Sequence, residues 1–174
     1  GLLVDQAINN VGRLVLIELP SICALPGQGD TGAMLITASS LAGINNGQQP
    51  DVHKGMCGHI GIIGGNNGMN GAAVLASTGA ARGGAGLVTI IAHEDSYKRL
   101  AAMAPPEIMV RSVKSYAQVS DMDFDTLAIG PGLGQGSWED EILDLLVSDI
   151  RPIVIDADAL NLLARNDPND LVNA

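Results

Sequence analysis

Two glycine-rich segments are the residues of this sequence best suited to binding a ligand. The first contains Gly64, Gly65 and Gly68, and the second is Gly130-Pro131-Gly132-Leu133-Gly134. Glycine lets the backbone turn sharply and approach a ligand closely. The helix expected after the first segment opens with small residues, whose free N–H groups could bind an anion. Because tight packing of a helix on a sheet needs the same small residues, spacing alone leaves both explanations open.

The second segment does not fit the two common nucleotide-binding patterns. The dinucleotide fingerprint G-x-G-x-x-G would need glycine where Gln135 or Ser137 stands. The phosphate loop G-x-x-x-x-G-K-[ST] is excluded because the sequence contains no Gly-Lys pair. A hydride-transferring enzyme of the ordinary Rossmann type is therefore not expected.

Two carboxylates, Asp156 and Asp158, follow an expected strand, and Asn161 lies three residues further on. Carboxylates at a strand end could hold Mg²⁺ or orient a substrate hydroxyl. We interpret Asp158 as the cap of the following helix. For Asp156 the sequence leaves a role in binding and a purely structural role equally open.

Composition narrows the class of partner. The net charge of −10 argues against nucleic acid, although an acidic protein can still bind a nucleotide through backbone amides. Cys23 and Cys57 form no metal or disulfide pattern, which favours a reducing compartment, and the three histidines have no zinc-type spacing. The sequence has no apolar run of about 18 residues and no signal-peptide pattern. We expect a cytoplasmic protein with no membrane partner and no metal held by its side chains.

Short apolar runs alternate with helical stretches, a pattern typical of α/β proteins. The expected strands are Arg13–Leu19, Ile60–Ile63, Leu87–Ala92, Ile108–Val110, Thr126–Ile129 and Ile153–Ile155. The expected helices are Gly71–Arg82, Asp95–Met103 (capped by Asp95 or Ser96), Trp138–Val147 and Ala159–Arg165.

Most of these strands are apolar throughout, which predicts a mostly parallel, doubly wound sheet with helices on both faces. In such sheets ligands bind at the carboxyl ends of strands where the strand order switches. Both glycine-rich segments follow strands, so we expect residues 65–72 to lie near residues 130–134.

Taken together, four segments resemble, in order, the motifs of the NAD(P)H-hydrate dehydratase family, the carboxyl-terminal half of bifunctional enzymes that repair nicotinamide cofactors. These segments are His53-Lys54-Gly55 with Gly58, then Ile63-Gly64-Gly65 through Met69-Asn70-Gly71-Ala72, then Ile129 to Gly134, and last Ile155 to Leu163. The resemblance covers about His53 to Ala164. Four ordered motifs are far more specific than any one of them.

The resemblance implies a ribokinase-like fold and a lyase that uses ADP or ATP, with Mg²⁺, to remove the added hydroxyl from hydrated NADH or NADPH. Carried over by motif, it points to Ala72 and Gly132 as residues that border the hydrated dinucleotide, followed by Gly65, Asn66 and Asp156. A homo-oligomer is expected for the full-length protein.

The family continues with a TPHPGE-like segment, a lysine-glycine segment near the nucleotide, and a Gly-Asp turn that supplies the base and the anion hole. This sequence stops at Asn173-Ala174 without them. The resemblance therefore assigns no catalytic residue, and we expect a sheet incomplete at its carboxyl-terminal side and a chain that is inactive alone. The alternatives are a vitamin-precursor kinase of the same fold and a non-catalytic nucleotide-binding module.

A second, weaker resemblance concerns the amino-terminal part of the chain. Leu16 to Ser21 is similar to the V-D-x-P-S-G end of the partner epimerase domain, but Glu18 stands where Asp is usual and Ile22 where Gly is usual. We interpret residues 1–50 as a degraded end of that domain plus a linker, with a chance match as the alternative. Residues 51–174 are then the amino-terminal part of the dehydratase domain.

Overall fold

The computed structural model of the protein describes residue 40 and residues 57–166. The chain divides into two units, Gly1–Gly47 and Gln48–Ala174, and residues 57–166 all belong to the second unit. The expected strand Arg13–Leu19 and the motif His53-Lys54-Gly55 lie outside the described residues. The assignment of residues 1–50 to an epimerase remnant stays a prediction.

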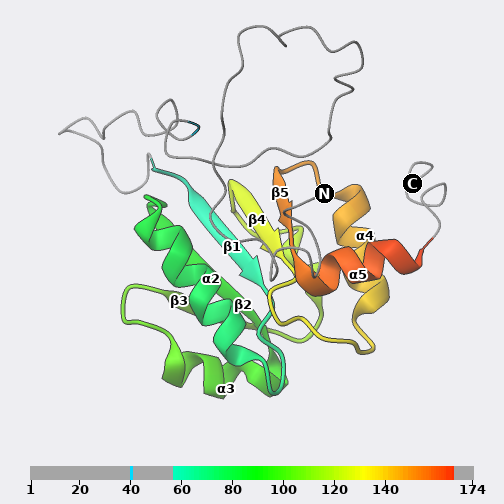
Figure 1. Ribbon diagram of the computed structural model, residues 1–174, viewed down its shortest axis with the longest axis horizontal. Helices are drawn as coiled ribbons and strands as arrows, with labels where there is room; N and C mark the ends of the chain where they lie inside the picture. The colour runs from blue at the N-terminus through cyan, green and yellow to red at the C-terminus, as the bar shows by residue number, and fades with distance from the viewer. Residues whose placement is uncertain (1–39, 41–56, 167–174) are drawn as a thin grey trace, which may run out of the picture. The chain divides into compact units, whose positions relative to one another are not determined.

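In the described part of the chain, five parallel strands form one sheet in the order β3-β2-β1-β4-β5 (Figure 1). The strands are β1 (His59–Ile63), β2 (Leu87–His93), β3 (Met109–Val113), β4 (Thr126–Ile129) and β5 (Ile153–Ile155). The first strand in the described chain therefore lies at the centre of the sheet. The predicted parallel α/β architecture is confirmed.

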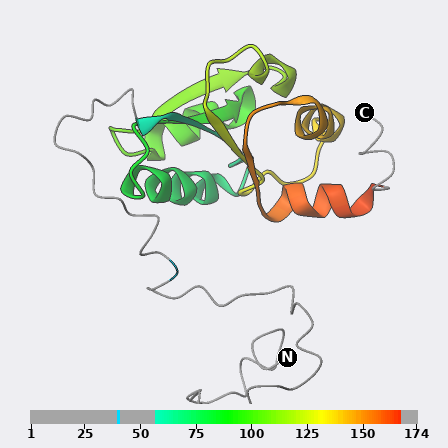
Figure 2. The same ribbon diagram turned by 90° about the horizontal axis from the view of Figure 1, so that it is seen from above.

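Within residues 57–166, four α-helices and one 3-10 helix connect and follow these strands. They are α2 (Asn70–Arg82), α3 (Glu94–Met103), the 3-10 helix η4 (Tyr116–Val119), α4 (Glu139–Ser148) and α5 (Ala157–Arg165). Viewed from above, α2 and α4 lie on opposite sides of the sheet (Figure 2).

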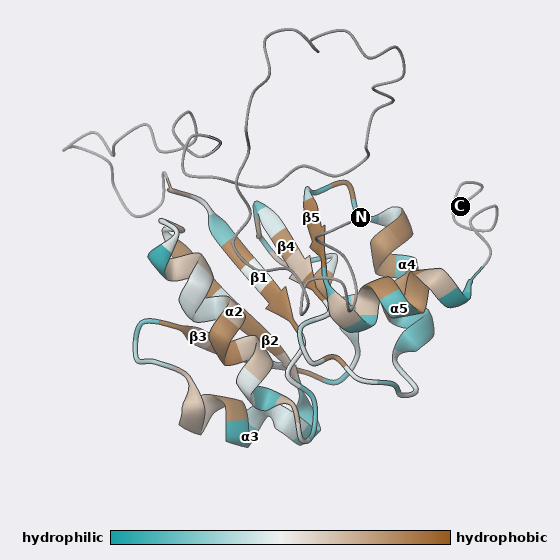
Figure 3. Ribbon diagram, viewed as in Figure 1, coloured by the Kyte–Doolittle hydropathy of each residue, from teal (hydrophilic) through white to brown (hydrophobic). Residues whose placement is uncertain are grey.

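The sheet separates two hydrophobic cores, because consecutive strand residues point to opposite faces. Ile62 pairs laterally with Ile90, and both belong to the core under α2 and α3. Ile63 pairs with Ile91, and both belong to the core that η4, α4 and α5 cover. This double burial explains why β1 and β2 are hydrophobic along much of their length (Figure 3).

The bounds of β1, α2, β2 and α4 differ from the expected ones by one residue at one or both ends, and three further expectations were wrong. The strand expected at Ile108–Val110 is Met109–Val113, because this edge strand has exposed residues and continues through polar Arg111 and Ser112. Helix α3 begins at Glu94 with His93 in the cap position, so neither Asp95 nor Ser96 is the cap. Helix α5 begins at Ala157, two residues before the expected start at Ala159.

Candidate functional site

The strand order reverses between β1 and β4, and both glycine-rich segments lie at that point. From β1 the described chain runs outward through β2 to β3, and it then returns to place β4 on the other side of β1. Ile63 and Ile129, the last residues of β1 and β4, are partners in the register. The two segments therefore emerge side by side, as predicted. We call residues 64–69 the first glycine loop and residues 130–134 the second glycine loop.

Backbone hydrogen bonds join these two loops directly. The Gly65 N–H donates to the Pro131 carbonyl at 2.9 Å, and the Asn66 N–H donates to the Gly132 carbonyl at 2.8 Å. The Gly130 N–H donates to the carbonyl of Ile63 at 3.1 Å. The pairing of β1 with β4 thus continues past the sheet, so the loops form one joint backbone surface.

Packing explains two of the glycines. A Cβ at Gly64 would lie 2.2 Å from the Pro131 carbonyl oxygen, and a Cβ at Gly130 would lie 1.8 Å from the carbonyl oxygen of Asp156. Gly130 also has a φ of +125°, a conformation that other residues rarely adopt. These two positions require glycine with or without a ligand.

Ala72 and Gly132, the two residues singled out first from the sequence, are neighbours. A Cβ built on Gly132 would lie 2.9 Å from the Cβ of Ala72 and 2.7 Å from the Met69 carbonyl oxygen. Ala72 belongs to the first turn of α2, so the second glycine loop lies against the start of that helix. Gly65 points elsewhere, since its Cβ would meet Ala73 at 2.7 Å in the core under α2.

Asn66 is buried, and its side chain is hydrogen-bonded at both ends. Its Nδ2 donates to the Leu133 carbonyl at 2.7 Å, and its Oδ1 accepts from the Tyr116 hydroxyl at 3.2 Å. Burial raises the pKa of Tyr116 to about 12, so that hydroxyl stays a donor at physiological pH. Asn66 therefore holds the second glycine loop in place through its side chain as well as its backbone.

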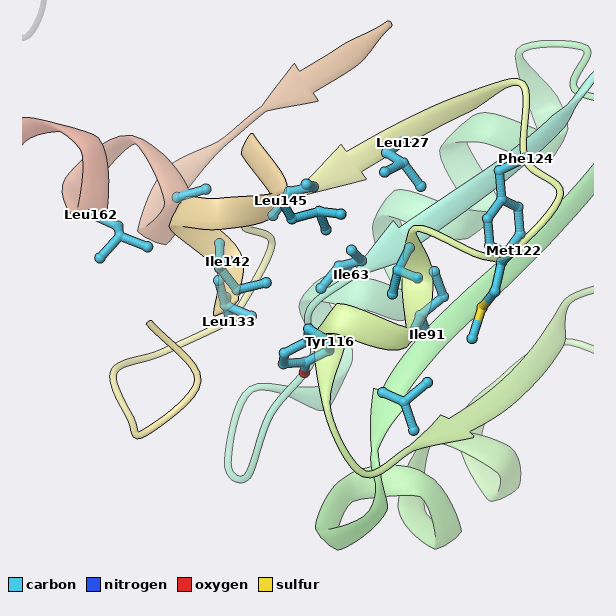
Figure 4. Packing of buried hydrophobic residues seen from close by; sticks show 14 residues of the cluster. Ile63, Ile91, Tyr116, Met122, Phe124, Leu127, Leu133, Ile142, Leu145 and Leu162 are labelled. Carbon is cyan, nitrogen blue, oxygen red and sulfur yellow. The ribbon is translucent and has the colours of Figure 1, made fainter. Parts of the chain in front are cut away.

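Tyr116 is a site-shaping residue that we did not predict from the sequence. It is fully buried among Ile63, Leu133 and Ile142 (Figure 4), and its N–H donates to Glu141 Oε2 at 2.7 Å. The chain has two tyrosines in all, and that rarity was the one signal in the sequence. The surrounding segment has no helix or strand periodicity that would have placed this ring beside the first glycine loop.

The last of the four motifs, Ile155 to Leu163, joins the same edge of the sheet through Asp158. Its Oδ2 accepts a hydrogen bond from the Gly134 N–H at 2.8 Å. The prediction that Asp158 caps the helix is wrong, because α5 starts one residue earlier and Asp158 lies within its first turn. Asp156 occupies the cap position without a side-chain cap bond, and its side chain is exposed. Its backbone N–H donates to the Ile129 carbonyl at 3.0 Å.

The described residues hold no group of three or more His, Cys, Asp or Glu side chains that could bind a metal ion. Within the same ranges no helix is long and apolar enough to cross a membrane.

Two cavities, of about 390 and 570 Å³, lie toward the amino ends of the strands, away from the glycine loops. The smaller one is lined in part by Asp149 and Arg151, which form an ion pair. Arg151 also donates to the Met122 carbonyl at 2.7 Å, so this pair ties the start of β5 to the segment before β4.

The sequence was compared with known protein families and proteins, and it matches one family over most of the described residues. Residues 60–173 match the family described as NAD(P)H-hydrate dehydratase. A bifunctional NAD(P)H-hydrate repair enzyme of Escherichia coli is 35% identical over 167 residues, which cover 95% of this chain and 32% of that protein. An ADP-dependent (S)-NAD(P)H-hydrate dehydratase of Lactiplantibacillus plantarum is 35% identical over 123 residues, covering 66% of this chain and 43% of that protein.

Solved structures show the same fold. A ribokinase-like superfamily protein from Enterococcus faecalis matches with a TM-score of 0.60 and 27% identity over 68% of this chain and 43% of its own. The ADP/ATP-dependent NAD(P)H-hydrate dehydratase from Bacillus subtilis, co-crystallised with ATP/Mg²⁺, matches with a TM-score of 0.56 and 29% identity over 66% of this chain and 42% of its own. The chain thus spans about a third of the bifunctional relative and less than half of the others.

Proposed function

The chain belongs to the NAD(P)H-hydrate dehydratase family, and from that premise we propose that it provides the dinucleotide-binding edge of an ADP- or ATP-dependent dehydratase. The substrate in this proposal is hydrated NADH or NADPH. The observation that carries the proposal is the pairing of the two glycine loops at the point where the strand order reverses. That place is where open α/β sheets bind their ligands.

Within this edge we propose different roles for the five residues singled out from the sequence. Ala72 and Gly132 border the hydrated dinucleotide, because they bring the first turn of α2 against the second glycine loop without side-chain bulk. Gly65 and Asn66 set the path of the first glycine loop, and the exposed Asp156 lies at the same edge. None of the five is proposed as a catalytic residue.

The charge distribution at the helix starts supports an anionic ligand beside α2. Helix α2 has no acidic residue in its first turn, whereas α3, α4 and α5 each have at least one. The positive end of the α2 dipole is therefore left without a neutralising carboxylate, which favours a phosphate group there. This fits a dinucleotide in a chain whose net charge is otherwise −10.

ADP or ATP would supply the phosphoryl group that turns the hydroxyl of the hydrated nicotinamide into a leaving group. We propose that Mg²⁺ accompanies the phosphates of this nucleotide, because the described residues offer no carboxylate cluster of their own. What this part of the chain supplies is a fixed backbone surface and a helix start, that of α2, with no acidic residue in its first turn.

The proposal is tested by Ala72→Trp, with Leu75→Trp as the matched control. Leu75 lies on the same helix but its side chain is 75% exposed, so an indole there meets solvent. In calorimetry with hydrated NADPH, Ala72→Trp should abolish binding, because the ligand would have to displace a large ring from its approach to the backbone. Leu75→Trp should bind as the unmodified protein does.

Gly132→Trp should also lose binding, but it is the poorer probe. The Cβ of the new side chain would clash with the Met69 carbonyl, so a loss of folding would give the same result as a loss of binding.

The protein that contains this chain should also regenerate NADPH from its hydrate when ADP or ATP is added. The near-ultraviolet absorbance of the reduced nicotinamide measures this reaction. Unchanged affinity in Ala72→Trp would show that the glycine loops only pack the fold. ATP-dependent phosphorylation of a vitamin-precursor alcohol, without hydrate binding, would favour the kinase alternative.

We also propose a cytoplasmic location and a homo-oligomeric state. The small number of cysteines supports a reducing compartment. The exposed apolar side chains of Ile150, Val154 and Leu160, in and near β5, support association.

A further inference from the structure

The sequence contains three Asn-Gly pairs, at residues 46–47, 67–68 and 70–71. Asparagine before glycine can lose its side-chain amide spontaneously, because the next backbone nitrogen attacks the side-chain carbonyl and glycine does not hinder that attack. Whether it does so in a folded protein depends on exposure, backbone freedom and the hydrogen bonds of the groups involved. The structure describes two of the three pairs, and they differ in all of these respects.

Asn67-Gly68, in the first glycine loop, has the features that favour the reaction. Asn67 is exposed, and no atom lies within 4 Å of where a Cβ of Gly68 would be. The Gly68 N–H donates no hydrogen bond within residues 57–166, so no bond must be broken before this nitrogen attacks. The φ of Gly68 is +87°, a conformation in which a bulkier residue would be strained.

The positively charged side chain of Arg99 contacts the side-chain carbonyl of Asn67. One guanidinium nitrogen of Arg99 donates to Asn67 Oδ1 at 2.7 Å. Because a guanidinium can only donate, the amide oxygen must be the atom that faces it. A positively charged donor at this oxygen polarises the carbonyl and stabilises the negative charge that develops when a nucleophile adds to its carbon.

We propose that Asn67 is a site of spontaneous deamidation and that Arg99 promotes it. The Gly68 backbone nitrogen loses its proton and bonds to Asn67 Cγ, the Cγ–Nδ2 bond breaks, and ammonia leaves with a proton. Water then opens the resulting succinimide ring. Cleavage at the side-chain carbonyl gives aspartate, and cleavage at the main-chain carbonyl gives isoaspartate. The net change is the replacement of –NH₂ by –O⁻, with water consumed and ammonium released.

Asn70-Gly71, three residues further along, is a protected counterpart in the same loop region. Asn70 is 7% exposed and is the first residue of α2. Its Nδ2, the leaving group in this chemistry, donates to the Gly65 carbonyl at 2.6 Å. Helical backbone geometry must be lost before the Gly71 nitrogen can reach the Asn70 side chain, so local unfolding has to precede reaction.

The modification would act on the proposed site through Asn66. Isoaspartate at position 67 adds a backbone carbon directly after Asn66, whose N–H and side chain hold the second glycine loop. We expect the modified protein to bind hydrated NADPH more weakly, and this last step rests on the proposed function.

The chemical step is tested by peptide mass spectrometry of the protein aged in mildly alkaline buffer. A reference sample aged in urea gives the rate for the unfolded chain. In the folded protein, Asn67 should convert at least about tenfold faster than Asn70, because Asn70 reacts only after local opening. In urea the two rates should become similar. Asn67 that stays intact while the urea sample reacts, or Asn70 reacting as fast in the folded protein, would overturn the proposal.

Two variants separate the role of Arg99 and the effect on binding. Arg99→Leu should slow conversion of Asn67 by about fivefold, the factor that corresponds to about 1 kcal/mol for an exposed charged contact. An unchanged rate would remove Arg99 from the mechanism. Asn67→Gln should abolish this modification and keep the binding of an aged sample equal to that of a fresh one. The mass measurement needs no ligand, so its failure is distinct from a failure of the proposed function.

Discussion

At the scale of single residues, Tyr116 links parts of the chain that are distant in sequence. Its N–H is held by Glu141 of α4, and its hydroxyl orients the amide of Asn66. That amide in turn binds the carbonyl of Leu133 in the second glycine loop. A single buried ring therefore connects the helix after β4 to the loop after β1.

Tyr116→Phe should lower the free energy of unfolding by about 1–2 kcal/mol, because Asn66 Oδ1 loses its partner in a buried place. Urea denaturation measures this loss. The same variant should weaken binding of hydrated NADPH by about fivefold, since the second glycine loop loses one of its fixing contacts.

Thr89→Val is the matched control for this substitution. It also removes a buried hydroxyl, whose partner is His59 Nε2 at 2.8 Å, but it lies toward the amino end of the sheet. We expect a similar loss of stability with unchanged binding. Equal effects of both variants on binding would show that Tyr116 serves stability alone.

The Asp149–Arg151 pair should give the protein an acid-sensitive component of stability. The hydrogen bond from Arg151 holds the pKa of Asp149 below its ordinary value of 3.8. A carboxylate with a lowered pKa in the folded state stabilises the fold above its unfolded pKa, and this contribution is lost as the pH falls through the lower, folded value. Arg151→Met should remove that component, so the variant should lose less stability on acidification below 3.8 than the wild type.

At neutral pH, Arg151→Met should lower the free energy of unfolding by roughly 3 kcal/mol, because it leaves the Asp149 carboxylate without its partner. The side chain of Asp149 is only 4% exposed. Glu139→Gln breaks a more exposed pair, Arg165–Glu139 at 3.4 Å, and should cost about 0.5 kcal/mol or less. Chemical denaturation over a pH series measures both. Similar costs for the two variants would mean that the Asp149 pair behaves as a surface contact.

At the scale of elements, the sequence was sufficient where hydrophobic pattern alone decides the structure. Thr126–Ile129 and Ile153–Ile155 are strands with the expected bounds, because each is a short, mostly apolar run that follows an aspartate or a proline and ends before a glycine or an aspartate. The pattern failed for β3, an edge strand that continues through polar Arg111 and Ser112 to the buried Val113. It also gave no sign of η4, whose start is fixed by a Ser115–Gln118 capping box rather than by periodicity.

The candidate site was predictable in its location but not in its connections. The carboxyl ends of adjacent parallel strands lie at one edge, so the proximity of the two glycine loops followed from the strand pattern. The bond from Gly134 to Asp158 and the bonds of Asn66 depend on tertiary packing, which one sequence does not reveal. Whether Ala72, Gly132 and the other selected residues bind a ligand stays a prediction.

Replacing each of two glycines, Gly79 and Gly130, by alanine should change the stability of the protein in opposite directions. Gly79 lies inside α2, and an added Cβ would have nothing within 4 Å, so Gly79→Ala should stabilise the protein by about 0.5–1 kcal/mol through helix propensity. Gly130→Ala should destabilise it by several kcal/mol, on the order of 3 or more, because its Cβ would meet the Asp156 carbonyl and its φ is positive. Thermal denaturation compares the two. A tolerated Gly130→Ala would mean that the backbone there can move away.

At the scale of the whole molecule, apolar side chains are exposed around β5. Val154 is 60% exposed, Ile150 is 99% exposed and Leu160 on α5 is 50% exposed. Among the described strands, β5 pairs with β4 alone, so its other edge has no strand partner there. Exposed apolar residues beside an unpaired strand edge favour association with another chain.

The 174-residue chain by itself should therefore self-associate, and Val154→Lys should reduce this association. A lysine on an edge strand opposes edge-to-edge pairing by charge repulsion and costs little because the position is exposed. Light scattering over a concentration series measures the average mass of both proteins. Arg111→Lys on β3, the opposite edge strand, is a charge-preserving control that should leave the mass unchanged. A monodisperse wild-type chain would contradict the prediction.

The central position of β1 also has a consequence for how the protein folds. β2 follows β1 after a single helix, whereas two strands (β2 and β3), two α-helices and the 3-10 helix η4 lie between β1 and β4. Contacts between sequence neighbours form faster than distant ones, so the β1–β2–β3 half can assemble while β4 is still unpaired. The first glycine loop can pair with the second glycine loop only after β4 has joined the sheet, so the joint surface of the two loops forms late in folding. A ligand that binds this surface would recognise finished molecules and not early intermediates, and it would shift the folding equilibrium toward them.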